Sequence, residues 1–353
     1  EKMRWKLGDN VQELLDHATQ RRNEFAEQGD FSLETVIEIA KDRFPERLED
    51  TLAIESIKVN PRVTTAVLQG NSLEDVDRYT KQAILNVDAA NSFIELLARE
   101  RSRLTVAAMS EINSRIENDL GESESPGALR RKQVTITGAD VQPPYWADIK
   151  DLLTEGIEFL EDSDLHPIEK ASYAHWLVAH VHPFENGNGR TARMVQDFIL
   201  IREGYLPVGV PKQKRAEYYD ALADADAGDG DQLVLLVAKS QVDALERANV
   251  IVSRNKHRAA RFENLIDRIQ QTGESSDSKR YEIWVRKMRQ FLDDVESNFS
   301  ALNNGEFLTF KIFRDELPTF DEWKALGSRS PGTRWYHWGL SIQVFSKKQF
   351  MFK

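Results

Sequence analysis

The feature that most limits how this chain can fold is a short polar loop between two apolar helical segments. The helical segments are residues 167–181 and 190–203, and the loop between them reads HPFENGNG. Pro183 ends the first helix, because proline disfavours helical geometry in the residue before it, so His182 is expected at a helix end. The glycines further along the loop permit backbone dihedral angles that other residues avoid. A sharp turn from one helix into the next is therefore expected.

The start of the second helix has the features of an anion site. The run GNG at residues 187–189 exposes backbone N–H groups, and the helix that follows favours anions at its amino end through free amides and its dipole. Arg193 lies three residues after Arg190, so both guanidinium groups can grip phosphate oxygens in the forked manner that lysine lacks. Surface arginines are common, but a glycine-rich turn directly before them favours anion binding. The pattern predicts a phosphate cradle.

A histidine beside a bound polyphosphate can act as a base. It can take a proton from an attacking hydroxyl, which suits nucleotidyl or phosphoryl transfer, where positioning and charge neutralisation supply most of the catalysis. A single histidine more often caps a helix or fills a core, but the loop around His182 favours the catalytic interpretation. His175 and His180 are expected to be structural. A zinc site of His180, His182 and Glu185 is disfavoured, because the spacing does not match a helical zinc signature and the proline breaks the helix.

Residues 182–193, HPFENGNGRTAR, resemble the signature of the Fic family, His-Pro-Phe-x-(Asp/Glu)-Gly-Asn-(Gly/Lys)-Arg-x-x-Arg. The similarity extends over about residues 104–247, where the segments around the loop resemble the two helices that frame it in the family. Better known members transfer AMP from ATP to hydroxyl side chains of proteins. The resemblance implies a mainly α fold with a Fic-type helical core, ATP as the nucleotide, and a target protein with a Ser, Thr or Tyr hydroxyl. Members that use UTP or CDP-choline keep a similar loop, so the loop alone does not identify the donor.

The resemblance assigns a role to each matching position. His182 would be the general base, and Phe184 the apolar anchor of the loop. The residues implied to bind the nucleotide are Gly187, Asn188, Gly189, Arg190 and Arg193, the last as partner of the terminal phosphate. Residues 131–138, RKQVTITG, match the family's flap, a short β-hairpin that would clamp the target backbone by strand addition. The docking residues of this flap would be Gln133, Val134, Thr135 and Ile136.

One position departs from the family pattern. Asn186 stands where the family has an Asp or Glu that binds Mg²⁺. Magnesium favours charged oxygen ligands, so the neutral amide is expected to hold it more weakly, and Glu185 could replace it only if the loop turned differently. Three outcomes are open: weaker metal affinity with normal chemistry, a different transferred group, or nucleotide binding without turnover. We expect the first, because the triphosphate itself supplies oxygen ligands for Mg²⁺.

A second resemblance lies upstream, in residues 51–57, TLAIESI. This run resembles the Fic inhibitory motif, (Ser/Thr)-x-x-x-Glu-(Gly/Asn), in the class II arrangement, where an inhibitory helix precedes the catalytic domain. Glu55 would form a two-pronged salt bridge with Arg193 and fill the place of the terminal phosphate. Ser56 replaces the usual Gly or Asn, a change expected to tighten the packing. The alternative is that Glu55 is a solvated or paired charge on an amphipathic helix.

At 353 residues the chain is long enough for two or three domains. The expected parts are a helical N-terminal region with the inhibitory helix (residues 1–103), a Fic catalytic domain (104–249) and a C-terminal α+β module (250–353). Within the first part, apolar residues recur every three or four positions from Val76 to Leu97 and predict a long helix that continues toward Ile116. Within the last part, helical stretches lead to strands at 307–313 and 335–352.

The charge is uneven along the chain and excludes some classes of function. The formal net charge is −11, but residues 250–353 hold 18 Lys and Arg against 13 Asp and Glu, which leaves −16 for the rest. The acidic part is unsuited to nucleic acid. The C-terminal part also carries four of the seven tryptophans, so nucleic-acid binding is considered there alone, although Trp more often fills a core. No apolar run approaches the roughly 18 residues of a membrane span.

The chain has no cysteine, which excludes disulfides and thiolate metal sites and suits a reducing compartment. It opens with Glu1-Lys2-Met3 and shows no basic and apolar leader, so we expect a cytoplasmic protein. A homodimer is compatible with the resemblance, since family members often pair through helical faces. A competing hypothesis is a non-catalytic nucleotide-sensing regulator. In that case Asn186 has removed competent metal binding, and the basic C-terminal part contacts DNA or a partner protein.

Overall fold

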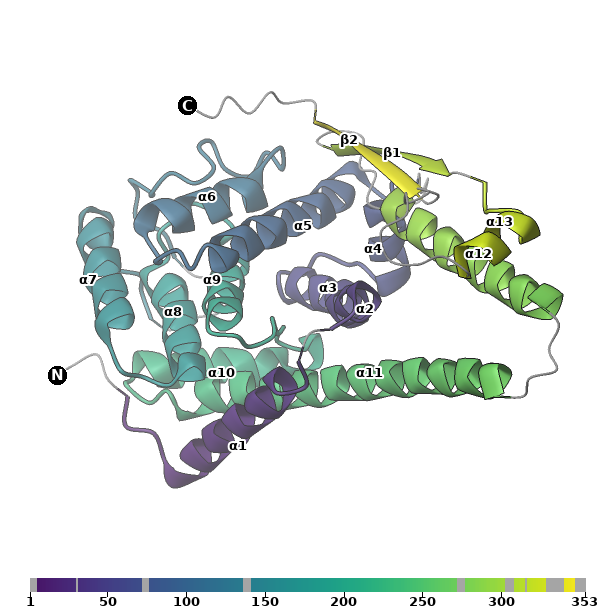
Figure 1. The fold of residues 1–353 in the computed structure, drawn as a ribbon. Helices are drawn as coiled ribbons and strands as arrows, with labels where there is room; N and C mark the ends of the chain where they lie inside the picture. Colours follow the sequence, from purple (N-terminus) through teal and green to yellow (C-terminus); the bar gives the residue numbers. More distant parts are fainter. Residues whose placement is uncertain are drawn as a thin grey trace. The chain divides into compact units, whose positions relative to one another are not determined.

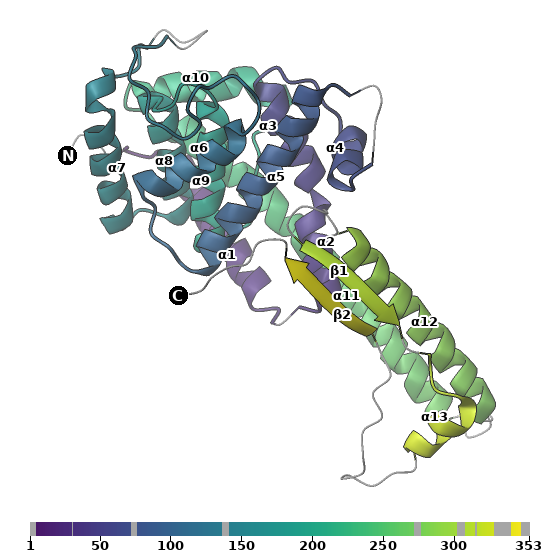
Figure 2. The same cartoon turned by 90° about the horizontal axis from the view of Figure 1, so that it is seen from above.

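The computed structural model describes residues 5–29, 31–71, 76–135, 141–271, 277–301, 308–314, 316–327 and 340–346. Most of these residues lie in helices, as the sequence predicts (Figures 1 and 2). The chain divides into two compact units. The first comprises residues 1–67 and 72–255, and the second residues 68–71 and 256–353. Within the described residues, no helix is both long and apolar enough to cross a bilayer.

The first unit holds the elements that position the candidate site. Its N-terminal helices are α1 (Asp9–Ala26), α2 (Leu33–Asp42), α3 (Phe44–Ile54), α4 (Pro61–Leu68), α5 (Arg78–Arg99) and α6 (Val106–Glu117). They are followed by η1 (Trp146–Asp148), α7 (Ile149–Asp162), α8 (Pro167–Val181), α9 (Asn188–Arg202), η2 (Lys212–Lys214) and α10 (Arg215–Asp226). The boundary between the units falls inside the next helix, α11 (Asp231–Gln271).

The pair of helices α8 and α9 forms the centre of the first unit, with α5 and α6 packed against α9 and α7 packed against α8 (Figures 1 and 2). The first thirteen residues of α9, from Asn188 to Leu200, are buried except for Gly189. A helix that is buried all round has no solvated face. Its polar side chains, Arg190 and Arg193 among them, must therefore find their partners inside the protein.

Local signals fix where α8 begins and how closely it packs. Pro167 occupies its first position, and Nδ1 of His166 accepts a hydrogen bond from the backbone N–H of Ile168 at 3.2 Å. On the neighbouring α7, a Cβ at Gly156 would clash with the side chain of Leu177. Glycine there lets the two helices approach closely. The packing against α7 holds α8 in place, and the loop begins at its C-terminal end.

The long helix predicted from Val76 toward Ile116 is two helices, so this prediction was wrong. Helix α5 ends at Arg99, and Arg101 adopts a left-handed conformation with φ of 51°. Thr105 then starts α6, because its hydroxyl accepts a hydrogen bond from the backbone N–H of Ala108 at 3.0 Å. The break allows α6 to pack against both α5 and α9.

The predicted β-hairpin flap is not formed in the part of it that the structure describes. Residues 131–135 carry no strand, and residues 136–138 lie outside the described residues. The side chain of Gln133 donates to the carbonyl of Pro143 at 2.8 Å, so a side chain rather than a ladder of backbone bonds holds this segment.

The second unit contains α12 (Asp277–Ala301), β1 (Leu308–Arg314), α13 (Phe320–Gly327) and β2 (Leu340–Ser346). The two strands pair antiparallel, with Leu308 opposite Ser346. Aromatic side chains join α12 to α13, namely Tyr281, Trp284, Phe320 and Trp323. Two of the tryptophans in the basic part of the chain therefore pack within their own unit. The other two, Trp335 and Trp338, lie outside the described residues.

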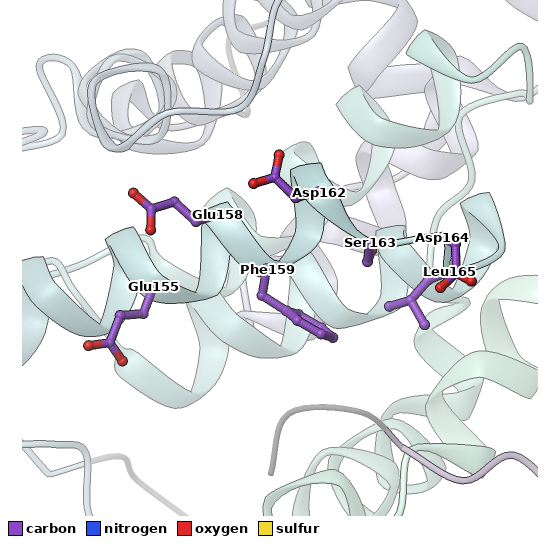
Figure 3. A pocket seen from close by; sticks show the side chains of 7 residues that line it. All are labelled: Glu155, Glu158, Phe159, Asp162, Ser163, Asp164 and Leu165. Atoms are coloured by element: carbon purple, nitrogen blue, oxygen red, sulfur yellow. The ribbon is translucent and has the colours of Figure 1, made fainter. Parts of the chain in front are cut away.

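An open hollow runs along α7 (Figure 3). It is lined by Glu155, Glu158, Phe159, Asp162, Ser163, Asp164 and Leu165. Four of these side chains are carboxylates, which give the hollow a negative potential. The hollow is unsuited to an anionic ligand, and no residue of the loop between α8 and α9 lines it.

Candidate functional site

The loop between α8 and α9 is a compact turn that is fixed from inside. Phe184 is 1% exposed and anchors the loop in the core, as predicted from the resemblance. The amide of Asn188 bonds the backbone of Phe184 twice, since Oδ1 accepts from its N–H and Nδ2 donates to its carbonyl, both at 2.9 Å. Gly187, with φ of 74°, adopts a left-handed conformation directly before α9. Asn188 thus stabilises the loop, and its contact with a nucleotide stays a prediction.

His182 lies at the C-terminal end of α8, as the sequence predicts, with φ of 50°. Its backbone N–H donates to the carbonyl of Val178 at 3.0 Å, and its Nδ1 lies 3.3 Å from the carbonyl oxygen of Ala179. A carbonyl can only accept a hydrogen bond, so we assign the ring proton to Nδ1. Nε2 then keeps its lone pair and is free to take a proton.

The surroundings of His182 favour the neutral imidazole. Burial lowers its pKa, the hydrogen bond to Ala179 raises it, the positive charge of Arg130 lowers it, and the negative charge of Glu55 raises it. The resulting pKa lies below the ordinary value of 6.5. A histidine that is neutral at physiological pH can act as a general base.

Two arginines of the first two turns of α9 are buried beside the loop. Arg190 is 4% exposed and Arg193 is 2% exposed. Nη2 of Arg190 pairs with Oε1 of Glu117 at 2.9 Å, but its Nε and Nη1 have no hydrogen-bond partner among the described residues. Nη1 of Arg193 also lacks a partner within the described part of the chain. Buried N–H groups without partners are costly, so these three nitrogens favour the binding of an anion here.

Glu55 covers the first turn of α9. It directly follows the last residue of α3, and its Oε1 lies 2.8 Å from Nη2 of Arg193. The second prong predicted for this salt bridge is replaced by Thr51, which accepts from Nε of Arg193 through its hydroxyl at 2.6 Å and from Nη2 through its carbonyl at 3.1 Å. A Cβ on Gly189 would clash with the Glu55 carboxylate, so glycine at this position lets the carboxylate reach the helix.

The carboxyl group of Glu55 is held in its charged form. Burial raises its pKa, but the charge and hydrogen bond of Arg193, with the charges of Arg190 and His182, lower it further than burial raises it. Ser56, the next residue, has φ of 67°, in the region where Gly and Asn are favoured. The backbone at this position therefore favours Gly or Asn, and the tighter packing expected from Ser56 stays a prediction.

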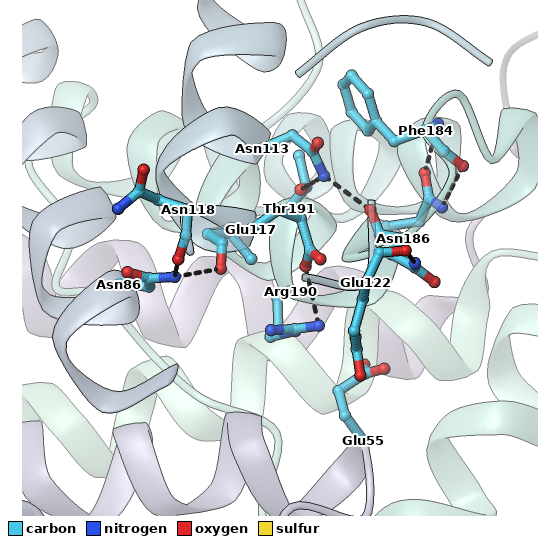
Figure 4. Close-up of polar contacts among 12 residues, drawn as sticks. Glu55, Asn86, Asn113, Glu117, Asn118, Glu122, Phe184, Asn186, Arg190 and Thr191 are labelled. Atoms are coloured by element: carbon cyan, nitrogen blue, oxygen red, sulfur yellow. Dashed lines mark hydrogen bonds and ion pairs between the residues drawn. The ribbon is translucent and has the colours of Figure 1, made fainter. Parts of the chain in front are cut away.

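Two residues of α6 that the sequence analysis did not single out reach the loop (Figure 4). Glu117 is 1% exposed, and a Cβ on Gly187 would clash with its carboxylate. Burial raises the pKa of Glu117 above its ordinary value, against the opposing charge of Arg190. Asn113, one turn earlier, donates to the backbone carbonyl of Asn186 at 2.9 Å. Both residues directly follow isoleucines on an amphipathic helix, a pattern that gives no sign of a site.

The residues around Asn186 do not form a charged metal site. Nδ2 of Asn186 donates to the carbonyl of Glu122, and its backbone carbonyl accepts from Asn113 (Figure 4). Its side chain can therefore offer a metal only the neutral Oδ1. Glu185 accepts hydrogen bonds from residues 123 and 124 instead. No three His, Cys, Asp or Glu side chains of the described residues gather as metal ligands.

The predicted docking residues of the flap are placed only in part. Gln133 and Thr135 are exposed, and Val134 is half-buried. Ile136 lies outside the described residues. The role of these four residues in docking a target therefore stays a prediction.

The histidines expected to be structural are held by polar partners. His175 is fully buried, and its ring nitrogens bond Gln196 at 2.9 Å and Tyr218 at 2.8 Å. Burial lowers its pKa to about 3, so it stays neutral. His180 bonds Asp226 at 2.7 Å. Neither ring is directed at the loop by these bonds.

Residues 103–200 of the chain match the Fic/DOC family. The protein named protein adenylyltransferase Fic from Drosophila persimilis is 31% identical over 204 residues, which are 56% of this chain and 39% of that protein. The protein of the same name from Aedes aegypti is 29% identical over 240 residues, which are 64% of this chain and 47% of that protein. The chain spans less than half the length of these curated relatives.

Solved structures share the fold. Fic-1 (aa134 - 508) from C. elegans has a TM-score of 0.62 and 26% identity, over 69% of this chain and 73% of that chain. A Fic family protein from Desulfovibrio desulfuricans G20 has a TM-score of 0.60 and 19% identity, and the similarity covers 98% of both chains. The second likeness concerns the fold alone.

Proposed function

Because residues 103–200 of this chain match the Fic/DOC family, we propose that the protein is an adenylyltransferase that moves AMP from ATP to a hydroxyl side chain of a target protein. One arrangement carries the proposal. The His182 imidazole, with Nε2 free, lies beside the amino end of α9, where buried nitrogens of Arg190 and Arg193 have no partner among the described residues. The names of the relatives, protein adenylyltransferases, support the same activity.

In the proposed reaction a Ser, Thr or Tyr hydroxyl of the target attacks the α-phosphate of ATP. A bond forms between the hydroxyl oxygen and the α-phosphorus, the bond to the bridging oxygen breaks, and pyrophosphate leaves. Nε2 of His182 takes the proton of the hydroxyl. The backbone amides at residues 187–189, with Arg190 and Arg193, neutralise charge on the phosphates.

Magnesium enters this proposal with the nucleotide. The side chain of Asn186 offers a neutral oxygen, so the oxygens of the triphosphate supply the charged ligands and Mg²⁺ arrives as part of the substrate. The expected consequence is weaker metal binding than a carboxylate would give, with unchanged transfer chemistry.

We propose that Glu55 inhibits this site within the same chain. Its charged carboxylate occupies the Arg193 nitrogen that the terminal phosphate needs, 2.8 Å from Nη2. ATP would then bind with its phosphates displaced from the position for attack. In this proposal residues 1–103 form the inhibitory region and residues 104–249 the catalytic domain, while residues 250–353 form a separate module.

The target is proposed to dock on the flap. The target backbone would pair with residues 133–136 as a further strand, because a ribbon gains stability when another strand pairs with it. A homodimer and a cytoplasmic location remain predictions, the first from the resemblance and the second from the lack of cysteine.

Transfer of label from radiolabelled ATP tests the proposal. The variant Glu55→Gly should incorporate more AMP into itself or a target than the wild type, by roughly 10- to 100-fold, because a hydrogen bond to a charged group contributes about 1.5–3 kcal/mol. The variant Glu46→Gly is a matched control, since Glu46 lies on the same helix and pairs with Arg43 at the surface. Incorporation by Glu55→Gly that is no greater than by His182→Ala would contradict the proposal.

A nucleotide-sensing regulator is the second candidate, and the neutral Asn186 favours it. Intact-mass measurement after incubation with ATP and Mg²⁺ separates the two candidates. A mass gain equal to adenylate supports the enzyme, whereas bound nucleotide without a covalent gain supports the regulator. For residues 250–353, binding to DNA that weakens as the salt concentration rises would support an electrostatic contact.

A further inference from the structure

Arg130 is a buried cation that the sequence analysis did not single out. It is 2% exposed and lies between α6 and η1, shortly before the predicted flap. Within the described residues its side chain pairs with no carboxylate; all of its hydrogen bonds go to backbone carbonyl groups. The backbone N–H of Arg130 donates to the carbonyl of Pro183 at 2.8 Å. In its side chain, Nε donates to the carbonyl of His182 at 2.8 Å and Nη1 to that of Lys132 at 2.9 Å. Nη2 donates to the carbonyls of Pro144 at 2.8 Å and Val181 at 3.4 Å.

These carbonyls belong to three segments of the site. Val181, His182 and Pro183 form the end of α8 and the start of the loop. Lys132 lies at the start of the predicted flap, and Pro144 follows it. A single side chain therefore joins the start of the flap and the residues that follow it to the backbone of the proposed general base.

We propose that Arg130 is a positioning residue that fixes the flap against His182, so that a hydroxyl presented by the flap meets the base in the correct place. The inference rests on the proposed function, because it assigns Arg130 a part in the same reaction. A guanidinium suits this task, since its five N–H groups point in fixed directions and it does not lose its proton. A cation at the carbonyl end of α8 is also favoured by the helix dipole.

The backbone of His182 needs support of this kind. A φ of 50° is unfavourable for a residue other than glycine and persists only where the surroundings fix it. The N–H of His182 is held by Val178, and its carbonyl is held by Nε of Arg130. Loss of the second bond would let the imidazole move relative to the loop.

The same guanidinium also holds the backbone at the start of the flap and at the residues after it. Lys132 and Pro144 are twelve residues apart in the chain, yet their carbonyls bond neighbouring nitrogens of Arg130. Within the described residues, one other hydrogen bond holds this segment, from the side chain of Gln133 to the carbonyl of Pro143. Without Arg130 the start of the flap and the residues after it lose their common attachment, and the target would be presented less accurately to the base.

The test uses the full chain carrying Arg130→Lys or Arg130→Gln, each alone and combined with Glu55→Gly. Lysine keeps the positive charge but offers all its donors from one nitrogen, so it does not bridge three segments. Arg99→Lys, at the exposed end of α5, is the matched control. Melting temperature and the amide hydrogen exchange of α9 show whether each variant is folded.

Hydrogen exchange without nucleotide gives the first readout. Amides of residues 131–135 and of Val141 and Gln142 should exchange several-fold faster in both Arg130 variants, and α9 and the Arg99→Lys protein should be unchanged. Incorporation of AMP by the Glu55→Gly protein into itself gives the second. Its kcat should fall by roughly 10- to 100-fold with the Arg130 variants, as for a small misplacement of reacting groups, while the KM for ATP stays the same.

Wild-type exchange in the flap segments of both variants would overturn the proposal, as would a kcat equal to that of the control. A rise in the KM for ATP that matches the fall in kcat would indicate a general structural role and would also overturn it. If both variants fail to fold, Arg130 is a folding residue and the proposal is wrong. Because the exchange readout needs no nucleotide, faster exchange without any AMP transfer would count against the proposed function alone.

Discussion

At the scale of single residues, the charge on His182 decides when the site can work. The imidazole accepts a proton only while it is neutral, and burial lowers its pKa below 6.5. Arg130 lowers this pKa as well, whereas the bond to Ala179 and the charge of Glu55 raise it. Since Glu55 also inhibits the site in our proposal, its removal should both expose the cradle and lower the pKa of the base.

We therefore expect kcat/KM of the Glu55→Gly variant to fall with decreasing pH only below pH 6.5, as His182 becomes protonated. The measurement is the profile of kcat/KM against pH, which reports the pKa of the base in the free enzyme. Tryptophan fluorescence over the same range serves as the control for acid unfolding. An acid limb centred above pH 6.5 would show that this imidazole is not the titrating base.

The residues of the loop could be predicted because their chemistry and their positions lie in one short run. His182 and Arg193 are brought together by their own helix end and helix start, which the proline and glycines already indicate. Glu117 and Arg130 could not be predicted, because each reaches the loop from a distant part of the chain. Their roles come from tertiary packing, which a local pattern does not encode.

At the scale of elements, α3 is the part that presents Glu55, and polar contacts hold it in place. These contacts are Arg47 to Asp197 at 3.3 Å, the N–H of Lys212 to Asp50 at 3.1 Å, and Nε of Arg215 to the carbonyl of Ile54 at 2.9 Å. The first is a buried ion pair, whose disruption would cost about 3–5 kcal/mol and damage the fold. The last lies directly beside Glu55 and can be removed without opening the core.

We expect Arg215→Gln to loosen the end of α3 and relieve inhibition in part. A hydrogen bond of this kind contributes about 1 kcal/mol, so AMP incorporation should rise by roughly fivefold, to a level between the wild type and Glu55→Gly. Lys214→Gln removes a neighbouring positive charge and serves as the control. Hydrogen exchange of residues 51–57 should quicken in Arg215→Gln alone. If incorporation stays at the wild-type level while this exchange quickens, the end of α3 does not control the site.

The helices around the loop could be predicted from the sequence, but the break between α5 and α6 and the state of the flap could not. Helices α8 and α9 were predicted because proline and glycine mark their ends and apolar residues fill them. The break between α5 and α6 was missed, because Thr105 caps a helix by one local hydrogen bond inside a continuous apolar pattern. The flap was predicted as a hairpin from alternating residues, but alternation does not supply the partner strand that a stable ladder needs.

At the scale of the whole chain, the described site residues all lie in the first unit. Residues 1–103 and 104–249, which were predicted as separate parts, contribute α3 and the loop to the same compact unit. The boundary predicted after residue 249 falls inside α11, because a single helix can continue while the composition of the chain changes along it. The basic C-terminal part supplies none of the described residues of the site.

Among the described residues, the basic start of α9 suits the phosphates of a nucleotide, and the acidic hollow along α7 does not. A crystal structure of the Glu55→Gly variant with a non-hydrolysable ATP analogue shows which of them it takes. We expect the phosphates to contact the backbone N–H groups of residues 187–189 and the side chain of Arg193, with Nε2 of His182 facing the α-phosphate. An analogue bound along α7, an empty loop, or an imidazole turned into the core would contradict the site.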